Sequence, residues 1–147
     1  KYIGKVESKG GTTSFLGIKE DEPIMMVRKA CQRAIDENVV DLQRSYEEFR
    51  TKTPLVSVEP LTAYIGKKEG VTEKSRYEVL EVVEMEDGTH KYKKVGEVEP
   101  IPGQIWDNRF MAKEEGAVGG TLEKTTFRSV SGKNFTRGML LREITKK

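Results

Sequence analysis

With 147 residues, the chain has the length of one domain, or of two very small domains that share a core. Its 26 Lys and Arg residues nearly balance 24 Asp and Glu residues, and this net charge of +2 argues against a dedicated polyanion-binding protein. No apolar run approaches the roughly 18 residues of a membrane span. Because the chain starts at Lys1 rather than Met, we expect a processed or trimmed piece of a longer polypeptide.

The N-terminal third is organised around one long periodic segment. Two short apolar runs, Lys1–Val6 and Ser14–Ile18, come first and predict a small hairpin or two strands. From Asp21 to Arg50, apolar residues recur at steps of three and four, which predicts an amphipathic helix. This apolar stripe consists of Ile24, Val27, Cys31, Ile35, Val39, Leu42, Tyr46 and Phe49. Too little chain precedes the helix to cover the stripe, so we expect the stripe to pack on the β structure that follows.

The remainder of the chain is typical of short strands. Leu55–Ile65 is rich in branched residues, but Pro60 confines it to a sheet edge or splits it. Tyr77–Met85 and His90–Val98 flank Asp87-Gly88 and predict a β-hairpin, since both turn residues tolerate positive φ. Further strands are expected at 104–106, 125–130 and 138–144, with a mobile glycine-rich loop at 113–124.

These elements predict an α+β protein. One long amphipathic helix, with short N-terminal strands, would pack with a C-terminal small SH3-like β-barrel. Phe135 in a tight turn, ahead of a strand that begins at Gly138, resembles the closing strands of such barrels. Residues 1–53 would carry the short strands and the helix, and residues 54–147 the barrel. A single core shared by both parts is the alternative.

No catalytic, cofactor-binding or metal-binding set is predicted. Cys31 lies on the apolar stripe and the only histidine, His90, is distant in sequence, so we interpret Cys31 as a buried structural thiol. His90 is interpreted as a surface residue, because one histidine without cysteine partners does not build a usual zinc site. Gly116, Gly119 and Gly120 lack the G-K-[ST] sequence of a phosphate-binding loop.

One cluster is a candidate partner-binding surface. Trp106, Asp107, Arg109 and Phe110 join the only tryptophan to an ion pair and a second aromatic ring, as interface anchors often do. The simpler interpretation places Trp106 in the barrel core, with Asp107-Asn108 turning the chain and Arg109 bonding a nearby carbonyl.

A basic strand is the second candidate surface. Lys91, Tyr92, Lys93 and Lys94 would serve a nucleic-acid-binding barrel by neutralising phosphates and stacking a base. Strand alternation, however, separates Lys91 and Lys93 from Tyr92 and Lys94, and Glu97 dilutes the charge. Solubility, or protection of an edge strand by lysines, explains the pattern more simply.

Two stretches carry a family resemblance. The helix Ala30–Arg50 running into Thr53-Pro54-Leu55, and the tail made of Gly103–Arg109 and Gly138–Ile144, resemble uncharacterised secreted or envelope proteins of Bacteroides-type bacteria. More distantly, the arrangement of a helix-plus-strands unit followed by an SH3-like barrel is similar to the flagellar assembly protein T and curli-transport lipoprotein group. The resemblance implies an extracytoplasmic module, periplasmic, outer-membrane-associated or secreted, that binds protein partners. Separately, no cofactor is expected.

The function predicted from these observations is a non-enzymatic protein-interaction or assembly module of the bacterial cell envelope. A homo-oligomer formed through the long helix is one expected form of it. The alternative function is nucleic-acid binding through the basic strand. An enzyme is the third option, for which no acid, base or nucleophile constellation is visible in the sequence.

Overall fold

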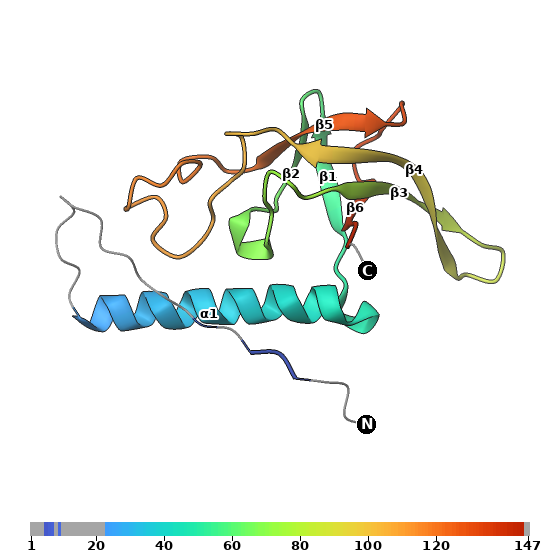
Figure 1. The fold of residues 1–147 in the computed structure, drawn as a ribbon. Coiled ribbons are helices and arrows are strands. Elements are labelled where there is room, and N and C mark those ends of the chain that lie inside the picture. Colours follow the sequence, from blue (N-terminus) through green and yellow to red (C-terminus); the bar gives the residue numbers. More distant parts are fainter. Residues whose placement is uncertain (1–4, 8, 10–22, 146–147) are drawn as a thin grey trace.

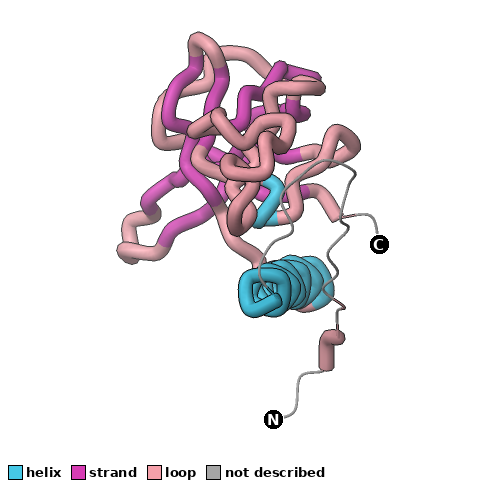
Figure 2. Tube along the Cα trace, turned by 90° about the vertical axis from the view of Figure 1, so that its left-hand side faces the viewer, coloured by secondary structure: helices cyan, strands magenta, loops and turns pink. Residues whose placement is uncertain are grey.

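A long helix lies along one side of a small β-barrel (Figures 1 and 2). The computed structural model describes residues 5–7, 9 and 23–145. The helix is α1 (Pro23–Ser45), and the predicted α+β class with a small barrel is confirmed. The predicted N-terminal strands fall outside the described residues, apart from 5–7 and 9, which form no strand.

The helix is shorter than predicted at its C-terminal end. α1 stops at Ser45 because Tyr46 adopts extended backbone angles, with φ −132° and ψ 123°. A separate single turn, η1 (Glu47–Phe49), follows before the chain enters the barrel. The predicted first residue of the helix, Asp21, lies outside the described residues.

Six strands close into a barrel. In spatial order they run β1-β2-β5-β4-β3-β6, and every neighbouring pair is antiparallel. Pro60 lies in the turn between the first two strands, so it splits the predicted Leu55–Ile65 segment as expected. The strand bounds are β1 (Thr53–Val58), β2 (Leu61–Ala63), β3 (Tyr77–Glu84), β4 (His90–Pro100), β5 (Thr125–Ser131) and β6 (Leu140–Glu143).

The predicted hairpin at Asp87-Gly88 is confirmed. β3 and β4 pair from Tyr77 opposite Val98 to Glu84 opposite His90. The carboxylate of Asp87 accepts hydrogen bonds from the backbone nitrogen and the hydroxyl of Thr89, at 2.9 and 2.6 Å. Gly88 has a φ of 76°, which a residue without Cβ adopts at little cost.

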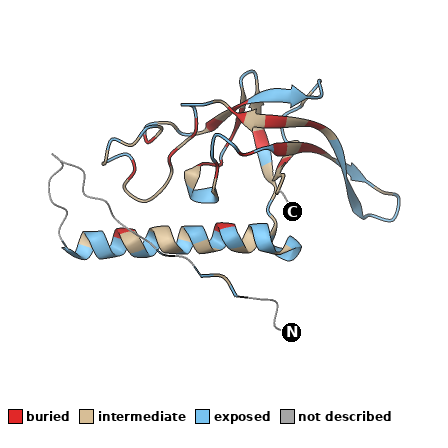
Figure 3. Cartoon of the chain, in the orientation of Figure 1, coloured by how far each residue is buried: buried red, intermediate tan, exposed pale blue. Residues whose placement is uncertain are grey.

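The hydrophobic core lies inside the barrel. Its buried members come from all six strands and from the connections between them: Leu55, Ala63, Ile65, Val71, Tyr77, Val79, Val98, Ile105, Phe127 and Leu141. The side chains of Tyr77 and Phe127 meet edge to face, with their ring centroids 5.6 Å apart. Buried positions are concentrated in the barrel, whereas α1 is mostly exposed or half-buried (Figure 3).

The connection between β4 and β5, residues 101–124, differs from the prediction in two ways. No strand forms at 104–106, where the backbone is irregular. Residues 113–124 were expected to have few anchors, but a succession of backbone hydrogen bonds closes them into turns, including Asp107 N to Gly119 O at 3.0 Å. Gly119 has a φ of 86°, and a Cβ there would lie 2.1 Å from Ile105 O. The close backbone approach therefore requires glycine at this position.

Candidate functional site

α1 faces the rest of the molecule with a polar side. Lys29, Arg33, Val40 and Arg44 are spaced by four, seven and four residues, which places them on one side of the helix. The buried residues of α1 are Lys29 and Val40, and Figure 3 shows its buried positions toward the barrel. The contact between helix and barrel therefore depends mainly on ion pairs and much less on apolar packing.

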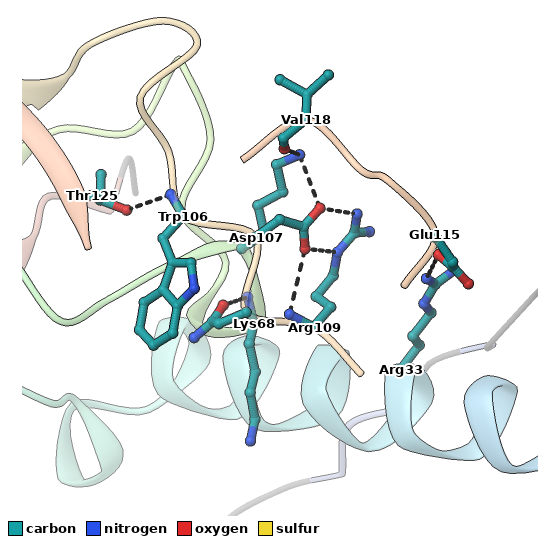
Figure 4. A network of polar contacts seen from close by, with 10 residues as sticks. Arg33, Lys68, Trp106, Asp107, Arg109, Glu115, Val118 and Thr125 are labelled. Atoms are coloured by element: carbon teal, nitrogen blue, oxygen red, sulfur yellow. Dashed lines mark hydrogen bonds and ion pairs between the residues drawn. The ribbon is translucent and has the colours of Figure 1, made fainter. Parts of the chain in front are cut away.

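Glu115, in the β4–β5 connection, holds the N-terminal half of α1. Arg33 donates from Nη2 to Glu115 Oε2 at 2.9 Å (Figure 4), and Lys29 forms an ion pair with the same carboxylate. The Lys29 side chain is only 8% exposed. Burial lowers the pKa of Arg33, and the positive charge of Arg109 lowers it further. One loop carboxylate thus compensates two helix cations.

Arg44 holds the C-terminal half of α1. It donates from Nε and Nη2 to the two carboxylate oxygens of Glu143 in β6, at 2.9 and 2.7 Å, and from Nη2 to Gly70 O at 2.9 Å. Its hydrogen bonds to Glu143 raise the pKa of Arg44. Beside this pair, a Cβ on Gly70 would lie 2.6 Å from a methyl carbon of Val40, so the helix approaches the barrel closely here.

The apolar stripe of α1 points away from the barrel. Arg33 and Ile35 are two residues apart, which is about 200° around the helix axis. Ile24, Val27, Ile35 and Val39 are accordingly 71, 64, 55 and 47% exposed. The prediction that this stripe packs on the β structure is wrong. The prediction of a buried Cys31 is also wrong, because Cys31 lies on the outward side and is exposed.

Asp107 is the centre of a second charged cluster. Its side chain is 0% exposed, and Arg109 donates to both carboxylate oxygens, from Nε at 2.9 Å and from Nη2 at 2.7 Å (Figure 4). Lys67, in the single turn η2 (Lys67–Glu69), donates to Asp107 Oδ2 at 3.2 Å and to Val118 O at 3.3 Å. Two segments of the chain therefore meet at the Asp107 carboxylate, and Lys67 links them to a third at Val118.

The pKa of Asp107 lies below its ordinary value. Burial by itself raises the pKa of this carboxyl group, but hydrogen bonds from Arg109 and Lys67 outweigh burial and lower it. The same contact raises the pKa of Arg109. Asp107 is therefore a structural anion held by two cations.

The other members of the predicted Trp106 cluster hold the same loop in place. Trp106 is half-buried, and its backbone nitrogen donates to Thr125 Oγ1 at 3.0 Å (Figure 4). Its neighbour Ile105, and not Trp106, belongs to the barrel core, so the interpretation of Trp106 as the core residue is wrong. Phe110 is half-buried, and Arg109 bonds a carboxylate where a carbonyl was expected.

The basic strand lies at the far end of the β3–β4 hairpin, outside the barrel. Lys91, Tyr92, Lys93 and Lys94 are all exposed. Lys94 pairs with Glu97, and the ammonium group of Lys52 lies 4.5 Å from the centre of the Tyr92 ring. The structure thus brings the basic strand near Lys52 and does not bring it to the Trp106 cluster.

Among the described residues, no group of three or more His, Cys, Asp or Glu side chains could hold a metal ion. A polar hollow of about 340 Å³ lies between α1 and η2 and is lined by Arg33, Asp36, Arg44, Lys68 and Arg109 among others. Most of its cations already pair with carboxylates of the chain.

Comparison with known proteins gives no match to a family model or to a curated protein. Within the part of the chain that the structure describes, no helix combines the length and the apolar character that crossing a membrane requires. The family resemblance stays a prediction.

Proposed function

We propose that this chain is a non-enzymatic protein-interaction or assembly module of the bacterial cell envelope, and that the outward stripe of α1 is its contact surface. The observation that carries the proposal is the row of exposed apolar side chains at Ile24, Val27, Ile35 and Val39, on the side of α1 opposite the barrel. Assignment of the barrel to the SH3-like class belongs to the same proposal and rests on the turn at Phe135 and Gly138.

The stripe has the dimensions of a helix-binding surface. From Ile24 to Leu42 it extends about 27 Å at 1.5 Å per residue. Spacings of three and four residues present a continuous ridge to another helix. Burial of each Val or Ile side chain would favour association by about 1.5–3 kcal/mol, before the costs of ordering. The occupant that fits this ridge is an amphipathic helix of another protein molecule, with a second copy of this chain as one such molecule.

Two further observations support a binding role. The charged side chains around the polar hollow, including Arg33, Arg44 and Arg109, are engaged with carboxylates of the same chain, which suits a structural role. The ion pairs also turn the polar face of α1 inward and hold the stripe outward. The envelope location rests on the resemblance of Ala30–Arg50 with Thr53-Pro54-Leu55, and of the tail made of Gly103–Arg109 and Gly138–Ile144.

The test is the size of the native complex. Detergent extracts of source-cell envelopes should contain the native protein in an assembly larger than the monomer on size exclusion. We expect the Ile35→Glu/Val39→Glu variant to elute as the free chain, because two carboxylates interrupt the ridge.

A matched variant, Gln104→Glu/Thr121→Glu, adds the same charge at exposed polar positions outside α1 and should elute with the native complex. Circular dichroism should show that all three proteins are folded. Elution of the stripe variant at the native position would exclude the stripe as the contact surface.

A further inference from the structure

The far end of the β3–β4 hairpin extends beyond the barrel. β6 pairs with β3 only from Tyr77 to Leu80, and β5 pairs with β4 only from Glu97 to Pro100. The two strands nevertheless continue to pair with each other as far as Glu84 and His90. We call residues 81–94 the β3–β4 arm, which Figure 1 shows projecting to one side.

Each strand of the arm has one edge that pairs with no further strand of the described chain. Among the described residues, no strand pairs with the outer edge of β4 over residues 90–94. Backbone N–H and C=O groups on such an edge can pair with an additional strand, as in β-strand addition. Because this surface contains no residue of the stripe, the inference does not rest on the proposed function.

The two faces of the arm carry different kinds of side chain. Lys91 and Lys93 lie on one face, with Glu81 directly opposite Lys93. Tyr92 and Val82 are opposite each other on the other face, 47 and 45% exposed. Neither Lys91 nor Lys93 makes an ion pair with any described residue. The free edge of β4 thus presents two lysines on one face and an aromatic ring on the other.

We propose that the outer edge of β4 binds an extended segment of a partner protein in which acidic residues alternate with apolar residues. Added as a strand, such a segment would place carboxylates beside Lys91 and Lys93, where cross-strand neighbours lie about 4.5–5.5 Å apart between Cβ atoms. Its apolar residue would lie beside Tyr92. Charge complementarity therefore specifies both the composition and the register of the occupant.

The same lysines disfavour pairing between two copies of the arm. A symmetric pairing of two β4 edges would bring Lys91 and Lys93 of one copy beside the same residues of the other. Pairing of two β3 edges centred on Glu81 would bring the Glu81 carboxylates of the two copies together in the same way. An acidic partner segment avoids both repulsions.

A peptide strand fits the arm better than a single-stranded nucleic acid. The Tyr92 ring, on which a base would have to stack, already has the Lys52 ammonium group 4.5 Å from its centre. Glu81 and Glu84 on the neighbouring strand would repel phosphates, and Lys94 is paired with Glu97. An open strand edge offers main-chain hydrogen bonds, which a nucleic acid does not match.

Fluorescence anisotropy with a labelled peptide of alternating Glu and Val tests the proposal. The native chain should bind this peptide, and Lys91→Glu/Lys93→Glu should weaken binding by about tenfold or more, because two attractive cross-strand pairs become repulsive. The control Lys74→Glu/Lys113→Glu makes the same charge change at exposed positions outside the arm and should bind as the native chain does. Hydrogen exchange over residues 90–94 should slow when the peptide is bound.

Two probes separate strand addition from other outcomes. A peptide of alternating Glu and Pro carries the same charge but lacks half of the amide donors, and it should bind at least about tenfold more weakly. Equal binding of the Glu-Pro peptide would overturn the proposal in favour of simple charge attraction. Binding of oligothymidylate with steep salt dependence, without binding of the Glu-Val peptide, would overturn it in favour of nucleic acid. Binding of neither probe would also overturn it.

Discussion

Replacing Asp107 by Asn is expected to lower the free energy of unfolding by about 3 kcal/mol. The carboxylate is fully buried and receives hydrogen bonds from Arg109 and Lys67, so the neutral amide leaves two cations without their counter-charge. The side-chain amide nitrogen of the substituted residue is itself a donor. It would face the donor groups of Arg109 or Lys67 at a position where the native carboxylate has an acceptor oxygen. Urea unfolding followed by the fluorescence of Trp106, which adjoins the cluster, measures the change.

The pH dependence of the free energy of unfolding distinguishes the loss of the Asp107 charge from a change in packing. Since the pKa of Asp107 in the folded protein lies below its unfolded value of about 3.9, the carboxylate contributes stability that is complete above that value. This stability is lost as the pH falls through the folded-state pKa. The difference between native and Asp107→Asn proteins should therefore be constant between about pH 5 and 8 and shrink below about pH 4. Asp41→Asn, at an exposed position of α1, should change stability little, and an equal effect of both variants would contradict the account.

Replacing Glu115 by Gln is expected to release the N-terminal half of α1 from the barrel. The variant removes one carboxylate that compensates both Lys29 and Arg33, and Lys29 is nearly buried. Removing one partner of a buried ion pair typically lowers the free energy of unfolding by about 3–5 kcal/mol. Because Arg33 is partly exposed, we expect a loss of about 3 kcal/mol here. Hydrogen exchange of the amides in the first half of α1 should accelerate about 100-fold, with the barrel unchanged.

The neighbouring substitution Glu114→Gln provides the control. Glu114 is exposed, and its substitution removes the same charge from the same loop. The amides of α1 should therefore keep their native exchange rates in this variant. High salt should accelerate exchange in the native protein only modestly, because the Lys29 contact is shielded from water. Unchanged exchange in Glu115→Gln would show that the ion pairs do not hold the helix.

Much of the fold could be predicted from local patterns. The period-two segments around Asp87-Gly88 contain both the strand signal and the turn signal, so the hairpin was predictable. The stripe of α1 was also predictable, but its direction was not. Periodicity identifies the residues that share a face, and it does not identify the face that meets the barrel. Long side chains such as Lys29 and Arg33 can be buried when a carboxylate compensates them.

The carboxylates that decide this direction have no sequence signal. Glu115 lies 82 residues from Arg33, and Glu143 lies 99 residues from Arg44. The sequence marked Asp107 and Arg109 as neighbours, but the third member of the cluster, Lys67, is 40 residues from Asp107. Contacts over such separations depend on barrel closure, which places loops and helix together only in the folded protein.

The accessibility of Cys31 in the native envelope shows whether the outward stripe of α1 is covered by a partner. Cys31 lies within the outward stripe of α1 and is exposed, so a thiol reagent should label it rapidly in the purified chain. If the stripe is the contact surface of an envelope assembly, Cys31 of the native protein should be protected in freshly isolated envelopes of the source cells. Mass spectrometry of the labelled peptide measures both rates. Equal labelling in purified chain and envelope would contradict the proposed function.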